Sequence, residues 1–148
     1  MALAKIVYAS MTGNTEACAD IVADKLEELG FEVECDECSS VDASDLEDAD
    51  LIAIGTYTYD DGELPDEIVD LYEDLEDIDL TGKVFGCFGS GDTFYDDFCV
   101  CVDMFEARLL LTGATKGAEL VRVDLAPEDE DEENLETFAE TLASHFDL

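Results

Sequence analysis

Short apolar runs alternate along the chain with longer stretches in which apolar residues recur every three or four positions. A run such as residues 3–9, which contains Ile, Val and Tyr, favours an extended strand. Over residues 14–29 the period becomes that of a helix with one buried face, and Gly30 follows at the position of a C-terminal cap. Because the same alternation continues to the C-terminal end, the pattern predicts strands and helices in turn.

Five strands and four helices are expected from this pattern. The strands are expected at residues 3–9, 31–35, 50–56, 83–89 and 117–124. The helices are expected at residues 14–29, after Pro65, at about 98–111, and at the end of the chain, where Leu135, Phe138, Ala139, Leu142 and Phe146 form an apolar stripe. Strict alternation of strands with helices predicts an α/β fold in three layers, a doubly wound parallel sheet with helices on both faces.

The length and composition fit one such domain. A chain of 148 residues is close to the usual size of a single hydrophobic core, and 47% apolar residues are enough to fill it. No internal repeat or linker divides the sequence, so residues 1–148 are predicted to form one domain. An acidic run at residues 128–133 is expected to begin the last helix, where negative charge is favourable.

The charge of the chain excludes several classes of partner. Six Lys and Arg residues stand against 41 Asp and Glu residues, which gives a net charge of −35. Nucleic acids and anionic membranes are bound through clustered cations, so neither is expected as a partner. A partner with a basic surface is favoured instead.

The cysteines and the N-terminal sequence favour a cytoplasmic protein. No apolar run is long enough to span a membrane, and the first residues lead directly into a predicted strand with no signal-peptide pattern. In the cytoplasm cysteines are normally free thiols. The six are Cys18, Cys35, Cys38, Cys87, Cys99 and Cys101.

Three segments that leave predicted strands carry the candidate chemistry. In open α/β sheets a ligand binds outside the carboxyl ends of the strands, where the strand order reverses. Residues 10–15, 56–62 and 89–99 follow the first, third and fourth strands. Together the three segments are rich in hydroxyl, glycine and aromatic residues, which core packing does not explain.

The first segment, with the sequence SMTGNT, has the composition of an anion-binding turn. Gly13 permits a backbone turn that other residues resist, and the amides at the start of the following helix point outward. The segment lacks the lysine of the nucleotide P-loop and the three glycines of the dinucleotide fingerprint. A terminal monophosphate held by amides and hydroxyls is therefore favoured over ATP or NAD. The alternative is an ordinary Ser/Thr-rich helix cap.

Aromatic residues in the other two segments indicate a flat ring bound between them. Tyr57 and Tyr59 lie in the second segment, and Tyr95 and Phe98 lie in the third. Each stacked pair would add about 0.5–1.5 kcal/mol beyond its burial. For Tyr57 and Phe98 the alternative is that they cap the core, whereas Tyr59 and Tyr95 stand among polar residues.

Together the three segments resemble those of the flavodoxin family, in particular its short-chain members from sulfate-reducing bacteria. The first matches the family's [ST]-x-T-G-x-T phosphate loop, and Thr58-Tyr59 and Gly91-Asp92-Thr93-Phe94-Tyr95 match its two ring-flanking loops. The resemblance spans essentially the whole chain. It implies a five-stranded sheet of order 2-1-3-4-5, with non-covalent FMN at the switch between strands one and three.

The resemblance also implies roles for individual residues. Tyr95 would stack on the outer face of the isoalloxazine ring and Tyr59 on its inner face, while Asp92 and nearby amides would surround the pyrimidine edge. The full candidate set is Ser10, Met11, Thr12, Gly13, Asn14, Thr15, Tyr57, Thr58, Tyr59, Asp60, Ser90, Gly91, Asp92, Tyr95, Phe98 and Cys99.

Two positions depart from the family pattern. Tyr59 stands where Trp is common, and its smaller ring should stack less strongly. Asp60 stands where Gly is often found, at a peptide that flips to meet the N5 proton of the one-electron-reduced flavin. Aspartate tolerates positive φ better than most residues but less freely than glycine, so Gly62 is expected to share the flexing.

The function implied is that of a low-potential, one-electron carrier rather than an enzyme. Such a carrier would be a monomer, would exchange with ferredoxin in role, and would serve redox enzymes and cytochromes with basic docking surfaces. Two alternatives are a receiver-type signalling domain and an acidic, ion-binding protein without cofactor. A receiver needs acidic residues at the ends of strands one and three, where this chain has Tyr8-Ala9-Ser10 and Gly55-Thr56.

Other catalytic or metal chemistry has little support in the sequence. Cys35 and Cys38 have the spacing of half a metal site, but Cys99 and Cys101 do not supply the matching half. His145 is the only histidine and has no partner in sequence for general-base catalysis.

Overall fold

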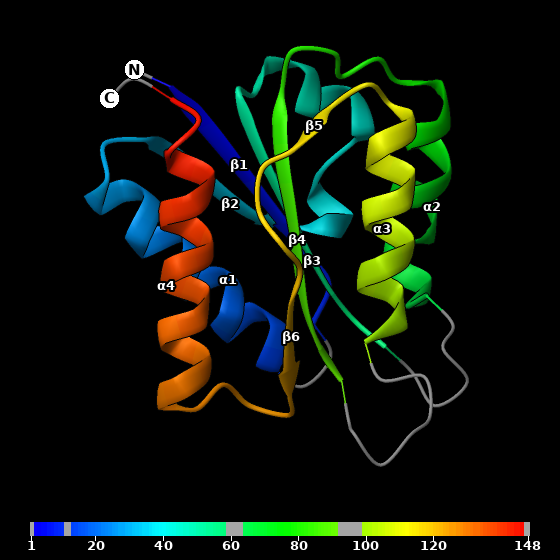
Figure 1. The fold of residues 1–148 in the computed structure, drawn as a ribbon. Coiled ribbons are helices and arrows are strands. Elements are labelled where there is room, and N and C mark those ends of the chain that lie inside the picture. The colour runs from blue at the N-terminus through cyan, green and yellow to red at the C-terminus, as the bar shows by residue number, and fades with distance from the viewer. Residues whose placement is uncertain (1, 11–12, 59–63, 92–98, 147–148) are drawn as a thin grey trace.

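A parallel sheet with helices on both faces forms the protein (Figure 1). The computed structural model describes residues 2–10, 13–58, 64–91 and 99–146. Over these residues the strand order is β2-β1-β3-β4-β5, with β6 also paired to β4, and every pair is parallel. The predicted fold class and strand order are therefore confirmed.

The elements alternate as the sequence pattern predicts. The strands are β1 (Leu3–Tyr8), β2 (Glu32–Glu37), β3 (Leu51–Tyr57), β4 (Val84–Gly91), β5 (Thr115–Lys116) and β6 (Val121–Asp124). The α-helices are α1 (Asn14–Glu28), α2 (Asp66–Asp74), α3 (Val100–Leu111) and α4 (Asp129–Ala143). Three short 3-10 helices, which the pattern did not predict, are η1 (Cys38–Ser40), η2 (Ala43–Asp48) and η3 (Leu75–Asp77).

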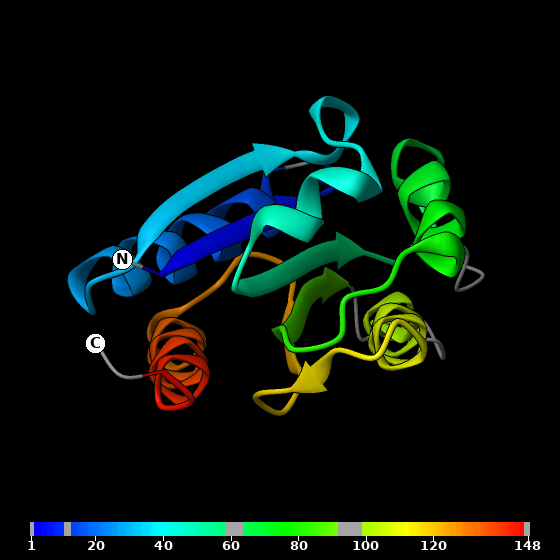
Figure 2. The same cartoon turned by 90° about the horizontal axis from the view of Figure 1, so that it is seen from above.

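The sheet separates two apolar clusters. Helices α1 and α4 cover one face, and η2, α2 and α3 cover the other (Figure 2). Side chains of β1 alternate between the clusters: Ile6 packs toward α1 and α4, and Val7 packs toward the opposite side. All seven residues of β3 are buried, which confirms the central strand expected from its unbroken apolar run.

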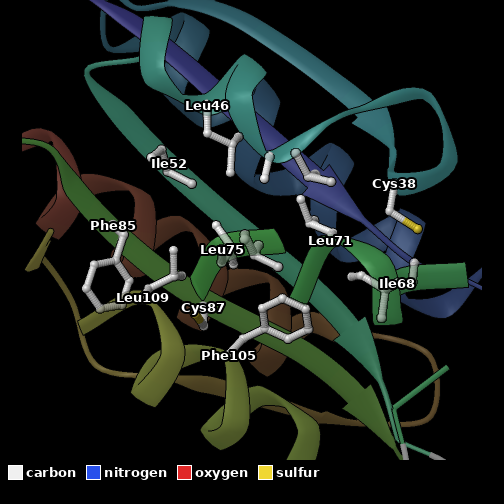
Figure 3. Close-up of a cluster of buried hydrophobic side chains, with 14 of the residues drawn as sticks. Cys38, Leu46, Ile52, Ile68, Leu71, Leu75, Phe85, Cys87, Phe105 and Leu109 are labelled. Atoms are coloured by element: carbon white, nitrogen blue, oxygen red, sulfur yellow. The ribbon is translucent and has the colours of Figure 1, made fainter. Parts of the chain in front are cut away.

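The cluster on the α2 and α3 side joins the sheet to the elements that cover it (Figure 3). Leu46 of η2, Ile52 of β3, Ile68 of α2, Phe85 of β4 and Phe105 of α3 meet there, each fully buried. Burial of one such side chain contributes about 1.5–3 kcal/mol, so packing on this face holds β3 and β4 firmly in place.

The predicted last strand, residues 117–124, is wrong as one continuous element. Two short strands, β5 and β6, replace it along the same edge of β4. The amide of Gly117 still donates to the carbonyl of Phe85 at 2.8 Å, but the Gly117 carbonyl bonds instead to Nε2 of His145 at 2.9 Å. The chain then leaves β4 and rejoins it at Val121, opposite Phe88. His145 thus has a backbone partner that its sequence context did not reveal.

The start of α4 has the expected acidic cap. Glu128 is the N-cap residue, and its amide donates to Oδ2 of Asp131 at 3.0 Å in a capping box. Four acidic residues occupy the first turn, where the helix dipole favours negative charge. The interpretation of residues 128–133 as a helix start is confirmed.

The cysteine pair with metal-site spacing is divided by the sheet. Cys35 packs against the cluster of α1 and α4, whereas Cys38 belongs to the cluster of α2 and α3. The two thiols therefore cannot ligate one ion without rebuilding β2. Within the part of the chain that the structure describes, no group of three or more His, Cys, Asp or Glu residues could hold a metal, and all six cysteines are free.

None of the helices in the described ranges is both long enough and apolar enough to cross a membrane.

Gly55 provides a test of the packing between β3 and β4. A Cβ atom at Gly55 would lie 2.3 Å from Cε2 of Phe88, a fully buried ring. We expect Gly55→Ala to lower the free energy of unfolding by about 1–3 kcal/mol, because the ring cannot move away. Urea unfolding without added ligand measures this.

Phe88→Leu is the matched partner in a double-mutant cycle. It removes the ring atoms that the new methyl group would meet, so the double variant should lose less stability than the sum of the single variants. Additive losses would show that the overlap at Phe88 is not the cause.

Candidate functional site

The three candidate segments start at one edge of the sheet. Because β1, β3 and β4 are parallel neighbours, their carboxyl ends lie together, at the lower edge in Figure 1. The amide of Ala9 donates to the carbonyl of Gly55 at 3.0 Å, and the amide of Thr58 donates to the carbonyl of Ser90 at 3.2 Å. These bonds continue the ladders beyond the last residues of β1 and β3, so the starts of the three segments are fixed side by side.

The first segment ends in an open helix N-terminus. Gly13 is the N-cap of α1 with a φ of 91°, a left-handed conformation that favours glycine. Its amide donates to Oγ of Ser10 at 3.0 Å, and its carbonyl accepts the first helical bond, from Ala17. The amides of Asn14 and Thr15 precede that bond and have no acceptor within the helix. This end of α1 can therefore bind an anion through its amides and dipole.

A buried pair of hydroxyls links the first segment to the third. Oγ1 of Thr15 and Oγ of Ser90 lie 2.7 Å apart, and the two residues are only 1% and 4% exposed. Either hydroxyl can donate in this bond. When Ser90 donates, the proton of the Thr15 hydroxyl is left for an anion at the helix N-terminus.

Ser90 also connects to the second segment. Its carbonyl accepts from the amide of Thr58, and Oγ1 of Thr58 accepts from the amide of Cys101 in α3 at 3.2 Å. Thr15, Ser90, Thr58 and Cys101 thus form a continuous chain of hydrogen bonds beneath all three segments. Cys101 was not among the predicted site residues, although its place just after the third segment is a signal that could have found it.

Tyr57 belongs to the core rather than to the open edge. Its side chain is buried in the cluster of α2 and α3, and its hydroxyl donates to Oε1 of Glu67 at 2.9 Å. Of the two alternatives for this residue, the structure favours a cap on the core. Its contribution to the site is to hold Thr58 in place.

Cys99 closes the third segment with a strained backbone. It is the N-cap of α3, has a φ of 53° and is fully buried. A left-handed conformation costs a non-glycine residue about 1–2 kcal/mol, so its peptide is held in one orientation by the surrounding structure. Its thiol lies 3.9 Å from the carbonyls of Gly89 and Val123, beneath the edge.

Burial makes the six cysteine thiols poor nucleophiles. Burial raises the pKa of the thiols of Cys18, Cys35, Cys38 and Cys99 to about 12. Burial also raises the pKa of Cys87 and of Cys101. Because the thiolate is the nucleophile, these side chains have little reactivity at neutral pH and act as packing groups.

Cations are missing from the three segments themselves. None of the six Lys and Arg residues lies within residues 10–15, 56–62 or 89–99. Arg122 is opposite Gly89 in the sheet register, but its guanidinium is paired with the carboxylate of Asp103. An anion bound at this edge would be held by amides and hydroxyls, without a counter-ion from the segments.

Part of the predicted set lies outside the described residues. Those positions are Met11, Thr12, Tyr59, Asp60, Asp92, Tyr95 and Phe98. Gly62, which was expected to share the flexing with Asp60, also lies outside the described residues. The structure brings eight of the remaining candidates to one edge: Ser10, Gly13, Asn14, Thr15, Thr58, Ser90, Gly91 and Cys99. The ninth, Tyr57, has its side chain in the core.

Comparison with known proteins identifies the family. The model of the flavodoxin family matches residues 6–138, nearly the whole chain. The chain belongs to the flavodoxin family. Flavodoxins bind FMN non-covalently and carry electrons, which excludes the receiver and cofactor-free alternatives.

Close relatives match this flavodoxin over most of their own length. The structure of the flavodoxin of Streptococcus pneumoniae TIGR4 is 62% identical, with a TM-score of 0.96 and coverage of 98% of this chain and 100% of that one. Probable flavodoxin 1 of Bacillus subtilis is 46% identical over 140 residues, 94% of this chain and 89% of the relative. The flavodoxin of Maridesulfovibrio salexigens is 37% identical over 131 residues, 86% and 90% of the two chains. The short-chain type inferred from the sequence is confirmed.

The residues at this edge fit the FMN phosphate. The open N-terminus of α1, the left-handed Gly13 and the hydroxyls of Ser10 and Thr15 form a neutral, donor-rich cradle. Hydrogen bonds from such donors to a charged acceptor contribute about 1.5–3 kcal/mol each. A phosphate can therefore be held here without lysine or arginine.

The hydroxyl pair gives a direct test of this cradle. We expect Ser90→Ala to raise the FMN dissociation constant about fivefold, because Thr15 loses its partner and the first and third segments lose their link. Fluorescence titration with FMN measures the constant. Ser44→Ala, an exposed position on η2, is the matched control. Equal affinities in the two variants would contradict the role given to Ser90.

Proposed function

We propose that this flavodoxin is a low-potential, one-electron carrier that holds FMN at the carboxyl edge of its sheet. The proposal depends above all on one observation: the open N-terminus of α1 is tied by the Thr15–Ser90 bond to the starts of both ring-flanking segments. FMN, when bound, supplies the one-electron chemistry. The chain supplies binding, orientation and the electrostatic field.

In this proposal the phosphate lies at the first segment and the ring lies between the other two. The amides of Asn14 and Thr15 and the hydroxyls of Ser10 and Thr15 would hold the phosphate. Tyr59 and Tyr95, one from each of the other segments, would cover the two faces of the ring. Support comes from the pairing of β1, β3 and β4, because the two strands that lead into the ring-flanking segments, β3 and β4, are direct neighbours.

The acidic residues of these segments would lower the potential for the second electron. Asp60, Asp61, Asp92, Asp96 and Asp97 lie in the second and third segments, where no Lys or Arg is present. A carboxylate about 10 Å from an anion, at an effective dielectric of about 20–40, disfavours that anion by about 0.8–1.7 kcal/mol. This corresponds to roughly 35–75 mV for a one-electron couple.

The partners of such a carrier would be redox enzymes and cytochromes with basic docking surfaces. The net charge of −35 steers opposite charge toward the protein, and a low potential would let it replace ferredoxin in role. The exposed edge of β2 carries Glu32, Glu34 and Asp36, whose charges oppose strand pairing between copies and support a monomer. Six free thiols support a cytoplasmic location.

A titration of the purified protein with FMN tests the proposed function as a whole. One equivalent should bind, with quenching of flavin fluorescence and a shifted absorption band. A protein that takes up no FMN would refute the proposal.

Tyr95 tests the stacking assignment. We expect Tyr95→Ala to raise the FMN dissociation constant about ten- to hundredfold, because both the stacking and the burial of the ring face are lost.

Tyr72→Ala is its control. Tyr72 packs edge-on against Phe105 at 5.2 Å between centroids, beneath the guanidinium of Arg108. Its loss should lower the free energy of unfolding and leave FMN affinity within about twofold. Equal dissociation constants for wild type and Tyr95→Ala would remove Tyr95 from the site.

The charge argument predicts a change in potential. The triple variant Asp60→Asn, Asp61→Asn and Asp96→Asn should raise the midpoint potential for the second electron by roughly 50–200 mV at low salt. The shift should shrink at high salt, because mobile ions screen these carboxylates. Redox titration at two ionic strengths measures both effects, and an unchanged potential at low salt would refute the electrostatic explanation.

A further inference from the structure

Leu125 combines two costly features, an exposed apolar side chain and a strained backbone. It is 52% exposed and has a φ of 60°, in the left-handed region that favours glycine. Among the described residues only one other non-glycine residue, Cys99, has a positive φ, and Cys99 is buried at the end of the third candidate segment. Strain that the surrounding structure maintains is often found where it serves function.

The position of Leu125 places it at the rim of the proposed FMN site. It directly follows β6, and its amide donates to the carbonyl of Gly91 at 2.8 Å. Gly91 is the last residue of β4, where the third candidate segment begins. In Figure 1 the end of β6 lies at the same edge of the molecule as the ends of β3 and β4. The hydrogen bond to Gly91 fixes the backbone here, and the left-handed turn leaves the leucine side chain half in solvent.

The surroundings of Leu125 combine an apolar centre with an acidic border. Ala126 is also exposed and Pro127 is half-buried, so residues 125–127 form a short apolar surface. Asp124 precedes this surface, and the acidic first turn of α4 follows it from Glu128. Protein interfaces commonly have this organisation, in which a small apolar centre supplies affinity and a charged rim supplies steering.

The two other exposed leucines differ from Leu125 in place and conformation. Leu110 and Leu111 are 50% and 83% exposed, but both lie in the last turn of α3. That turn is followed by Thr112, whose carbonyl accepts from Leu80, ahead of the amino end of β4. They therefore lie at the edge of the sheet opposite the site and have ordinary helical backbone, so they serve as controls.

We propose that residues 125–127 are the apolar centre of a docking surface for redox proteins with basic surfaces, with Leu125 as its main contact. This inference rests on the proposed function, because docking here brings a partner next to the FMN segments. Charge complementarity identifies the occupant: the acidic border and the net charge of −35 favour a ring of lysines or arginines around an apolar contact. A second copy of this chain would bring like charges together.

Electron transfer to mitochondrial cytochrome c, a basic haem protein, provides the probe. Reduced, FMN-loaded Leu125→Ala should transfer electrons about fivefold more slowly than wild type at fixed ionic strength, because the apolar contact is lost while the acidic border remains. FMN affinity, midpoint potentials and the salt dependence of the rate should be unchanged. Leu111→Ala should react at the wild-type rate.

Leu125→Gly separates the effect of losing the side chain from the effect of the strained backbone. It removes the same contact and relieves the positive φ, so the rate should fall as in Leu125→Ala while the urea midpoint rises above that of Leu125→Ala. A wild-type rate in either Leu125 variant at full FMN occupancy would overturn the docking role. An equal loss in Leu111→Ala would overturn it as well.

Failure of the proposed function is a separate result. It would appear as an absence of FMN uptake by the unaltered protein, before any electron-transfer measurement, and would overturn the docking role with it. A slow Leu125→Ala with normal FMN affinity and potentials supports both.

Discussion

Three strand ends at one edge do not by themselves make a binding site, because loops that leave a parallel sheet are free to diverge. The hydrogen bond between Thr15 Oγ1 and Ser90 Oγ holds the start of α1 against the end of β4, so the first and third segments cannot diverge there. Both hydroxyls are buried, so breaking the bond would leave polar groups without water or protein partners. Through the Ser90 carbonyl and Thr58 the same link reaches Cys101, so hydrogen bonds connect the helix N-terminus to the starts of the second and third segments.

Electrostatics in this protein separate binding from redox tuning. The proposed phosphate cradle consists of amides, hydroxyls and a helix dipole, which attract an anion without adding a full positive charge. A lysine in the same place would bind phosphate more strongly but would also stabilise a negatively charged ring nearby. By leaving cations out of the three segments, the chain can hold an anionic cofactor and still keep the field around it negative.

Backbone strain is concentrated next to the same edge. Cys99 and Leu125, the described non-glycine residues with positive φ, lie at the ends of segments that meet β4 near Gly91. One is buried at the end of the third segment, and the other is exposed and presents its side chain to solvent. The apolar clusters on both faces of β3 and β4 supply the stability that tolerates this strain.

The sequence alone determined the alternation of strands and helices and the two-sided burial of β3, because these depend on local periodicity within short segments. Residue types alone predicted an anion-binding turn at residues 10–15, whereas the strand order came from the resemblance to flavodoxins and is confirmed by the structure. The sequence did not reveal the split of the last strand, where the Gly117 carbonyl accepts a hydrogen bond from His145, 28 positions away. Nor did it show that the Tyr57 hydroxyl bonds to Glu67 or that the Thr15 hydroxyl bonds to Ser90. Folding alone brings these partners together. Tertiary structure decided which hydroxyls and rings face the core, because a side chain's direction depends on the elements that pack around it.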